Sequence, residues 1–175
     1  SMTKPIVSVA AIRLIEACKL SLYSNIQDFI PSFKNLRVLK HNGELERVKR
    51  PLNLADLLTH TAGLSYNFNM GCSVAQFYQQ ENILNDPNIS LEELVDKIAT
   101  LPLAFQPGES WRYSVATDVI GRLLEVVENK NLSEVLSEQI FAPLGMKDTD
   151  FSVSKSNATK IMPMHGDTDA NKLIS

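Results

Sequence analysis

The chain has few cysteines, no long apolar run and no excess of positive charge. Its 175 residues contain 2 cysteines and carry 17 Lys+Arg against 20 Asp+Glu, a formal net charge of −3. Without a cluster of Lys or Arg there is no electric field to hold a phosphate backbone or an anionic membrane. No stretch reaches the roughly 18 consecutive apolar residues that a membrane span needs. We therefore expect neither a nucleic-acid partner nor a membrane-spanning segment.

The two cysteines, Cys18 and Cys72, are too few to build a disulfide scaffold. Neither has the Cys-x-x-Cys or Cys/His spacing that would hold zinc, so we predict no metal site and expect both to be inert packing residues. So few cysteines fit either side of a bacterial inner membrane, and the compartment stays open between cytoplasm and periplasm.

The composition is otherwise ordinary, with 44% hydrophobic and 21% charged residues. Together with a length near the commonest domain size, it predicts one soluble domain with its own core. No basic-then-apolar leader is visible, because the first residues already follow a helical pattern.

Helical periodicity dominates the chain. Apolar residues recur at helical spacing from Lys4 to Leu20, and Pro5 fits a helix only in its first turn, so this helix is predicted to begin close to Ser1. Its buried stripe is predicted to contain Ile6, Val7, Ala10, Ala11, Leu14, Ile15 and Cys18. Further helices are predicted at about 53–59, 73–84, 91–100, 115–128 and 133–141.

Capping signals support two of these helices. Asn53 can cap the helix at 53–59, and Gly63 is predicted to supply its left-handed stop. Ser90 and Glu93 form a capping box for the helix that follows them.

A single hairpin signal interrupts the helices. Asn42-Gly43 stands between two short alternating runs within residues 35–50, which predicts a small exposed β-hairpin with a two-residue turn. No strand–helix alternation indicates a parallel sheet, so the predicted fold class is mainly α with a small β-hairpin.

A hydroxyl and an amine lie three residues apart at the start of the chain, in Ser1-Met2-Thr3-Lys4. At a helix N-terminus the dipole favours an anionic oxygen, and a close ammonium or amine can stabilise an alkoxide or take its proton. By itself this pattern is weak, because Ser152-Val153-Ser154-Lys155 repeats it in a polar tail. Ser1 also fits a helix cap, or an expression scar.

Four sequence blocks favour a catalytic role for Ser1 over a helix cap or an expression scar. They are SMTKPIVSVAAIRLIEACKLSL, RPLNLADLLTHTAGLSY, LPLAFQPGESWRYSVATDVIGRLLEVV and IFAPLGMKDTDFSV. In this order and spacing the chain resembles the serine β-lactamase and penicillin-binding-protein-like hydrolases. The likeness is to the branch of class C β-lactamases, family VIII carboxylesterases, DD-peptidases and the mitochondrial β-lactamase-like protein.

The resemblance implies the helical region of an α+β fold whose flanking antiparallel sheet is largely missing. It divides the chain into a nucleophile helix at about 1–20, a helical region at about 21–151 and a polar tail at about 152–175, all in one domain fragment. The helix face that such a sheet would cover is then exposed, so we expect self-association through it.

The resemblance also assigns catalytic roles. Ser1 matches the nucleophile that forms an acyl-enzyme, Lys4 the neighbouring lysine and Tyr113 the tyrosine of the second motif. A phenol acts as a base near neutral pH only if neighbouring cations stabilise the phenolate, and Lys4 is the candidate cation. The oxyanion hole would use the Ser1 N–H and a second N–H from a strand. This chemistry needs no metal or organic cofactor.

Three positions depart from the family pattern or are ambiguous. Val115 stands where penicillin-recognising members carry Asn, and an apolar residue there favours an ester over a peptidic substrate. His165 precedes Gly166 at the wrong spacing for the third motif, which we do not find. His60 is interpreted as structural, pairing with the last carbonyls of its helix.

These features predict a serine hydrolase, specifically a carboxylesterase acting on small acyl esters. A β-lactamase or DD-peptidase with the same chemistry is one alternative, and a non-catalytic fragment or penicillin-binding-like scaffold is the other. For this chain alone we expect little or no turnover, because loss of one oxyanion donor costs a factor of about 10² to 10³.

Overall fold

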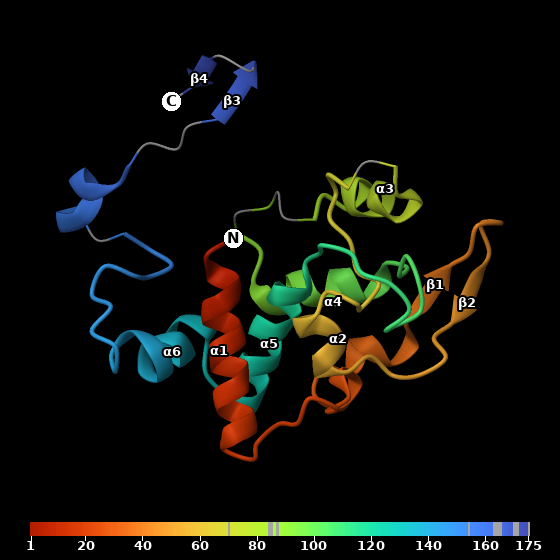
Figure 1. Cartoon of the computed structure of the whole chain (residues 1–175), viewed down its shortest axis with the longest axis horizontal. Coiled ribbons are helices and arrows are strands. Elements are labelled where there is room, and N and C mark those ends of the chain that lie inside the picture. Colours follow the sequence, from red (N-terminus) through yellow and green to blue (C-terminus); the bar gives the residue numbers. More distant parts are fainter. Residues whose placement is uncertain are drawn as a thin grey trace.

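The computed structural model describes residues 1–69, 71–83, 86, 88–153, 155–162, 166–169 and 172–174. Helices dominate it, as the sequence predicts (Figure 1). The α-helices are α1 (Thr3–Glu16), α2 (Leu54–Leu58), α3 (Ser73–Gln80), α4 (Leu91–Thr100), α5 (Ala116–Glu128) and α6 (Leu132–Leu136). Short helices η1 (Ile26–Asp28), η2 (Pro31–Asn35), η3 (Ser137–Phe141) and η4 (Lys155–Lys160) join them, η3 continuing α6 as a π-helical turn.

Helix α5 is the centre of the core. It contacts α1, α2, α4 and α6, and its residues Val119, Leu123 and Leu124 are fully buried. Gly121 lets α6 and α4 approach, because a Cβ there would lie 3.0 Å from a Leu132 methyl and 3.3 Å from one of Leu91. The predicted helix at 115–128 is thus confirmed and is the scaffold against which α1 is placed.

The N-terminal helix α1 buries one face against this scaffold. Val7, Ala10, Ala11 and Leu14 are buried, as their spacing predicts. The helix ends at Glu16, earlier than predicted, and Cys18 follows in a left-handed conformation with φ 56°. The prediction that Cys18 is a packing residue is wrong, because it is exposed, whereas Cys72 is partly buried against the core.

The predicted hairpin consists of β1 (Arg37–Leu39) and β2 (Leu45–Arg47), paired antiparallel with Leu39 opposite Leu45. Its turn differs from the predicted two-residue type. The Lys40 N–H donates to the Glu44 carbonyl and the Gly43 N–H to the Lys40 carbonyl, so three residues form the loop. Gly43, with φ 84°, takes the left-handed position that a three-residue loop needs.

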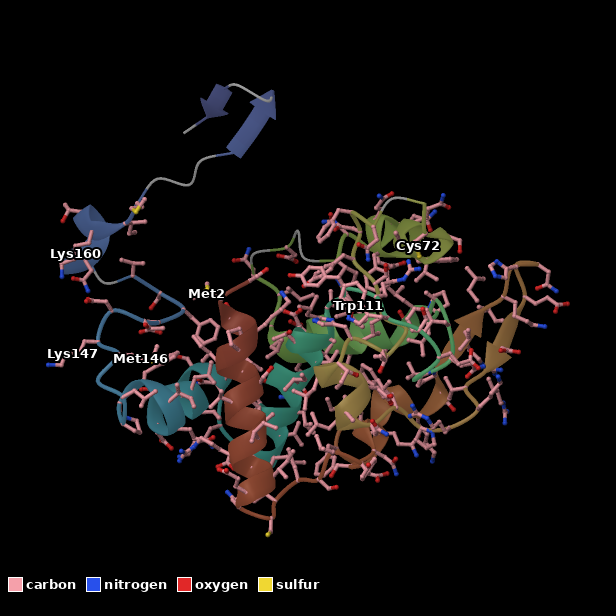
Figure 2. All side chains as sticks on the ribbon, in the orientation of Figure 1. Met2, Cys72, Trp111, Met146, Lys147 and Lys160 are labelled. Atoms are coloured by element: carbon pink, nitrogen blue, oxygen red, sulfur yellow. The ribbon has the colours of Figure 1, made fainter. Side chains whose placement is uncertain are left out.

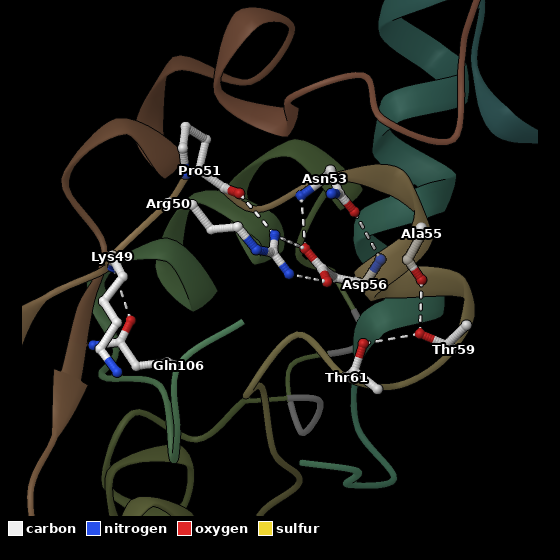
Figure 3. Close-up of polar contacts among 9 residues, drawn as sticks. All are labelled: Lys49, Arg50, Pro51, Asn53, Ala55, Asp56, Thr59, Thr61 and Gln106. Atoms are coloured by element: carbon white, nitrogen blue, oxygen red, sulfur yellow. Dashed lines mark hydrogen bonds and ion pairs between the residues drawn. The ribbon is translucent and has the colours of Figure 1, made fainter. Parts of the chain in front are cut away.

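An ion pair fixes the start of α2 (Figure 3). The Arg50 guanidinium makes two bonds to the Asp56 carboxylate, at 2.6 and 2.7 Å. Asp56 also accepts the Asn53 N–H while Asn53 accepts the Asp56 N–H, which is a capping box. Asn53 is therefore confirmed as the cap of this helix.

The end of α2 differs from the prediction. His60, not Gly63, is the left-handed residue directly after the helix, with φ 57°. The Thr61 N–H donates to the Asp56 carbonyl and the His60 N–H to the Leu57 carbonyl, which is a Schellman motif. Gly63 is also left-handed, and a Cβ there would press on the Phe105 carbonyl oxygen.

The segment after α2 runs beside the segment that precedes Tyr113. The carbonyls of His60, Thr61 and Gly63 accept N–H groups from residues 112, 108 and 104, at 2.9, 2.9 and 2.7 Å. We call these three bonds the 60–63 ladder. It ties two connections that are distant in sequence.

The C-terminal part holds structure that the sequence did not predict. Beyond η4, β3 (Gly166–Asp169) pairs antiparallel with β4 (Lys172–Ile174), whereas the residues from 152 were expected to form only a polar tail. His165 lies outside the described residues. No helix in the described part of the chain is long and apolar enough to cross a membrane.

Candidate active site

Ser1, Lys4 and Tyr113 lie together. The Ser1 Oγ lies 2.8 Å from the Tyr113 Oη, a hydrogen bond in which either hydroxyl can donate. Ser1 lies two residues before the start of α1 at Thr3, and its carbonyl accepts the Lys4 N–H at 3.3 Å. The Lys4 Nζ lies over the Tyr113 ring, 4.6 Å from its centroid. Residues 112 positions apart in sequence thus share one polar cluster.

Backbone contacts hold Tyr113 in place. The Asn69 side-chain amide donates to the Tyr113 carbonyl at 3.0 Å and to the buried Ser65 Oγ at 3.1 Å. The Arg112 N–H donates to the His60 carbonyl as part of the 60–63 ladder. The segment that carries Tyr113 is therefore held by these hydrogen bonds on one side and by the start of α5 at Ala116 on the other.

Lys4 is held as a cation. Burial works against its ammonium, but hydrogen bonding to Tyr113 and the nearby Tyr66 and Tyr113 phenols outweigh burial and raise the pKa of Lys4. A lysine with a raised pKa is a poor proton acceptor at neutral pH. The environment therefore favours electrostatic stabilisation by Lys4 over direct removal of the serine proton.

Tyr113 responds in the opposite sense. Hydrogen bonding to Lys4, followed by that to Ser1, lowers the pKa of Tyr113. Both interactions favour the phenolate, the form that can accept the Ser1 proton. The two shifts belong to a coupled pair, since the same contact raises one pKa and lowers the other.

Tyr66 joins this cluster and was not predicted from the sequence. Its ring lies 5.2 Å from that of Tyr113, and its phenol is close enough to the Lys4 ammonium for the two groups to interact. Burial raises the pKa of Tyr66, so this phenol stays neutral beside the ammonium. The available signal was its position three residues after Gly63 in the block HTAGLSY.

His60 also faces the site, which corrects its expected role. Its Nδ1 lies 3.3 Å from the Ser114 Oγ and its ring lies 5.3 Å from that of Tyr113, so the ring does not serve the last carbonyls of α2. Burial, with the charge of Lys4, lowers the pKa of His60. The imidazole is therefore neutral at pH 7 and packs beside the phenol.

Val115 packs in the core. It is fully buried, with 0% of its surface exposed, and it directly precedes α5. Core packing occupies this side chain, and the expectation that an apolar residue here favours an ester stays a prediction. Among the described residues no group of three or more His, Cys, Asp or Glu could hold a metal ion.

The comparisons with known proteins identify the family of the chain. A family model described as Beta-lactamase matches residues 1–174. The chain belongs to the Beta-lactamase family. Esterase EstB of Burkholderia gladioli is 32% identical over 94% of the chain, and the Lovastatin esterase of Penicillium rubens 35% identical over 86%. The chain spans 40% and 38% of these two relatives, about two-fifths of their length.

A solved structure supports the fold. EstCE1, described as a hydrolase with promiscuous acyltransferase activity, matches the whole chain with a TM-score of 0.83 and 29% identity, over 44% of its own length. The mainly helical architecture with a hairpin matches part of this β-lactamase-like fold, as predicted.

Proposed function

We propose that Ser1, Lys4 and Tyr113 are the nucleophile, the cation and the base of a carboxylesterase that acts on small acyl esters. The 2.8 Å bond between the Ser1 and Tyr113 hydroxyls carries this proposal, because it provides a direct path for the serine proton. The activity belongs to the protein that carries these 175 residues, which we take to form a single β-lactamase-like domain region.

The proposed reaction has two balanced halves. Tyr113 takes the Ser1 proton as the Ser1 Oγ bonds to the acyl carbon, and the alcohol oxygen then leaves with that proton. Water next attacks the acyl-Ser1 ester and gives a proton to Tyr113. The carbon–Oγ bond breaks, and Ser1 recovers the proton as the acid is released.

Lys4 stabilises the Tyr113 phenolate from which each half of the reaction starts and to which it returns. The ammonium faces the phenols of Tyr113 and Tyr66, and the described residues show no ion pair to Lys4 that would fix its charge on a carboxylate. Its charge is therefore available to the Tyr113 oxygen when that oxygen loses its proton.

The test uses a fluorophosphonate label and hydrolysis of p-nitrophenyl acetate. We expect the label on Ser1, and we expect Ser1→Ala to lower kcat/KM by at least about 10³-fold. Ser8→Ala, which changes another serine of the same segment within α1, is the matched control and should leave kcat/KM unchanged. A parent protein that neither takes the label nor turns over short esters would refute the proposal.

The same assay separates the remaining functions. Hydrolysis of a chromogenic cephalosporin at the ester rate would favour a β-lactamase, since Ser1, Lys4 and Tyr113 serve both reactions. Binding without turnover in the intact protein would favour a non-catalytic scaffold.

Self-association is proposed for the outward face of α1. Met2, Val9 and Ile12 are 83%, 50% and 43% exposed and follow one another at helical spacing. We expect analytical ultracentrifugation of this chain to show dimers or larger species that Val9→Lys weakens. A monodisperse monomer at high concentration would contradict this.

A further inference from the structure

Five rings form a continuous row through the candidate site. Phe68 stacks on Tyr66 with centroids 4.7 Å apart, and Tyr66 lies 5.2 Å from Tyr113. Tyr113 lies 5.3 Å from His60, which lies 6.2 Å from Trp111 in an edge-to-face arrangement. These separations are those of interacting aromatic pairs. We call this set the aromatic row, and its middle ring carries the hydroxyl that bonds Ser1.

The row is buried in part and open at both ends. Tyr66 is 8% exposed, whereas Phe68 and Trp111 are 58% and 64% exposed. In the view of Figure 2, Trp111 is labelled between Met2, at the start of α1, and Cys72, at the start of α3. Phe68 and Trp111, the two ends of the row, thus present apolar surface to solvent, and Tyr113 lies between them in the row.

The row is rigidly supported. Trp111 and Tyr113 flank Arg112, whose N–H bonds the His60 carbonyl, and Asn69 anchors the Tyr113 carbonyl to the connection that carries Phe68. Exposed rings on a fixed backbone lose little conformational entropy when a ligand covers them. Their exposure therefore suits recognition better than packing.

The charges along the aromatic row restrict the class of ligand that it can bind. His60 is neutral at pH 7, because burial and Lys4 lower its pKa, and Tyr66 keeps its proton. The described contacts place Lys4 over Tyr113, at the middle of the row, where the reacting ester group would lie. The two ends thus offer ring faces and edges to an uncharged, flat group.

We propose that the aromatic row, Phe68, Tyr66, Tyr113, His60 and Trp111, binds an aromatic ring attached to the scissile ester. This rests on the proposed function, since the row lies beside the scissile bond only if Ser1, which bonds Tyr113, is the nucleophile. It adds a substrate class: esters of aromatic acids, or aryl esters, in preference to saturated rings of the same size. An aromatic pair contributes a factor of roughly two to twelve in affinity beyond the area it buries.

Binding is tested without turnover. Acetophenone and cyclohexyl methyl ketone are matched, non-hydrolysable probes that differ in ring aromaticity. Trp111 is the only tryptophan of the chain, so its indole N–H gives one assignable proton NMR signal. We expect acetophenone to shift this signal by its ring current and to bind several-fold tighter than the saturated ketone.

Variants locate the effect. Trp111→Ala and Phe68→Ala are each expected to weaken both ketones through lost contact area, and to reduce the preference for acetophenone over the saturated ketone about two- to twelvefold. Tyr23→Ala removes a 78% exposed ring outside the row and is expected to change neither. Equal affinities for the two ketones, or an unmoved Trp111 signal, would overturn the proposal.

Turnover then identifies which part of the ester uses the row. A kcat/KM preference for methyl benzoate over methyl cyclohexanecarboxylate assigns it to the acyl group, and one for phenyl acetate over cyclohexyl acetate assigns it to the alcohol. No preference in either pair contradicts the aromatic specificity. Because the ketones bind without reaction, failure of Ser1 labelling alone would refute the proposed function and not the row.

Discussion

Lys4 and Arg50 are two cations in different surroundings. Arg50 faces a carboxylate, Asp56, through two short bonds, and the Asp56 side chain is only 6% exposed. Lys4 faces the phenols of Tyr113 and Tyr66 instead. A carboxylate partner holds a charge in place, whereas a phenol can gain or lose the proton that the charge attracts. The first arrangement stabilises structure and the second suits proton transfer.

The largest effect is expected from removing the active-site cation. Lys4→Met should lower ester kcat/KM by about 10²- to 10⁴-fold, because the Tyr113 phenolate loses the contact that most lowers its pKa. The acidic limb of the pH–rate profile should move to higher pH. Urea unfolding should change little. A profile that stays in place would show that Lys4 does not act on Tyr113.

Arg50→Met should have the reverse signature. It leaves the buried Asp56 carboxylate without its cation, so we expect a loss of about 3 kcal/mol in the free energy of unfolding, measured in urea. Lys49→Met is the control, because the Lys49–Glu109 pair is exposed and should cost less than about 1 kcal/mol. Equal losses of unfolding free energy from Arg50→Met and Lys49→Met would show that the Arg50–Asp56 pair stabilises the fold no more than an exposed pair does.

Tyr66→Phe tests the second phenol, with a smaller effect. The Tyr66 phenol helps to raise the pKa of Lys4, chiefly through its electrostatic effect on the ammonium. The alkaline limb of the pH–rate profile should therefore move to lower pH and the rate fall about tenfold or less. Tyr78→Phe is matched, because this buried phenol bonds the Ser65 N–H and not Lys4. A tenfold loss with an unmoved alkaline limb would indicate a packing role.

The smallest effect concerns His60. Its pKa is lowered on folding, so the unfolded chain binds more protons as pH falls through the ordinary histidine value near 6.5. Stability from this group is present above that value and is lost as pH falls toward the folded pKa. His60→Asn, which tolerates the left-handed conformation, should flatten the dependence of Tm on pH between 7 and 5. An unchanged slope would contradict this.

The sequence predicts what local rules determine. Helix periodicity located α1, α4 and α5, and short-range capping chemistry located Asn53 and the Ser90–Glu93 box. The resemblance selected Ser1, Lys4 and Tyr113, which the fold brings together. Their catalytic roles stay predictions.

What was missed depends on contacts distant in sequence. His60 takes a left-handed conformation that Gly63 was expected to take, because its N–H and that of Thr61 complete the Schellman bonds while the ring turns to Ser114. Tyr66 meets Lys4 only after α1 packs beside the connection that follows α2. The burial of Val115 was also not predicted, because a local motif does not show which of its residues the core covers.

The 60–63 ladder has a consequence for how this protein tolerates changes in length. Its three backbone bonds join residues 60, 61 and 63 to residues 112, 108 and 104, so one inserted residue between Gly108 and Arg112 would shift the Tyr113 hydroxyl by about 3.3 Å, the rise of one extended residue. That exceeds the 2.8 Å now separating it from Ser1. Side chains there can vary while the number of residues stays constant, whereas the hairpin tip at Gly43 can accept insertions.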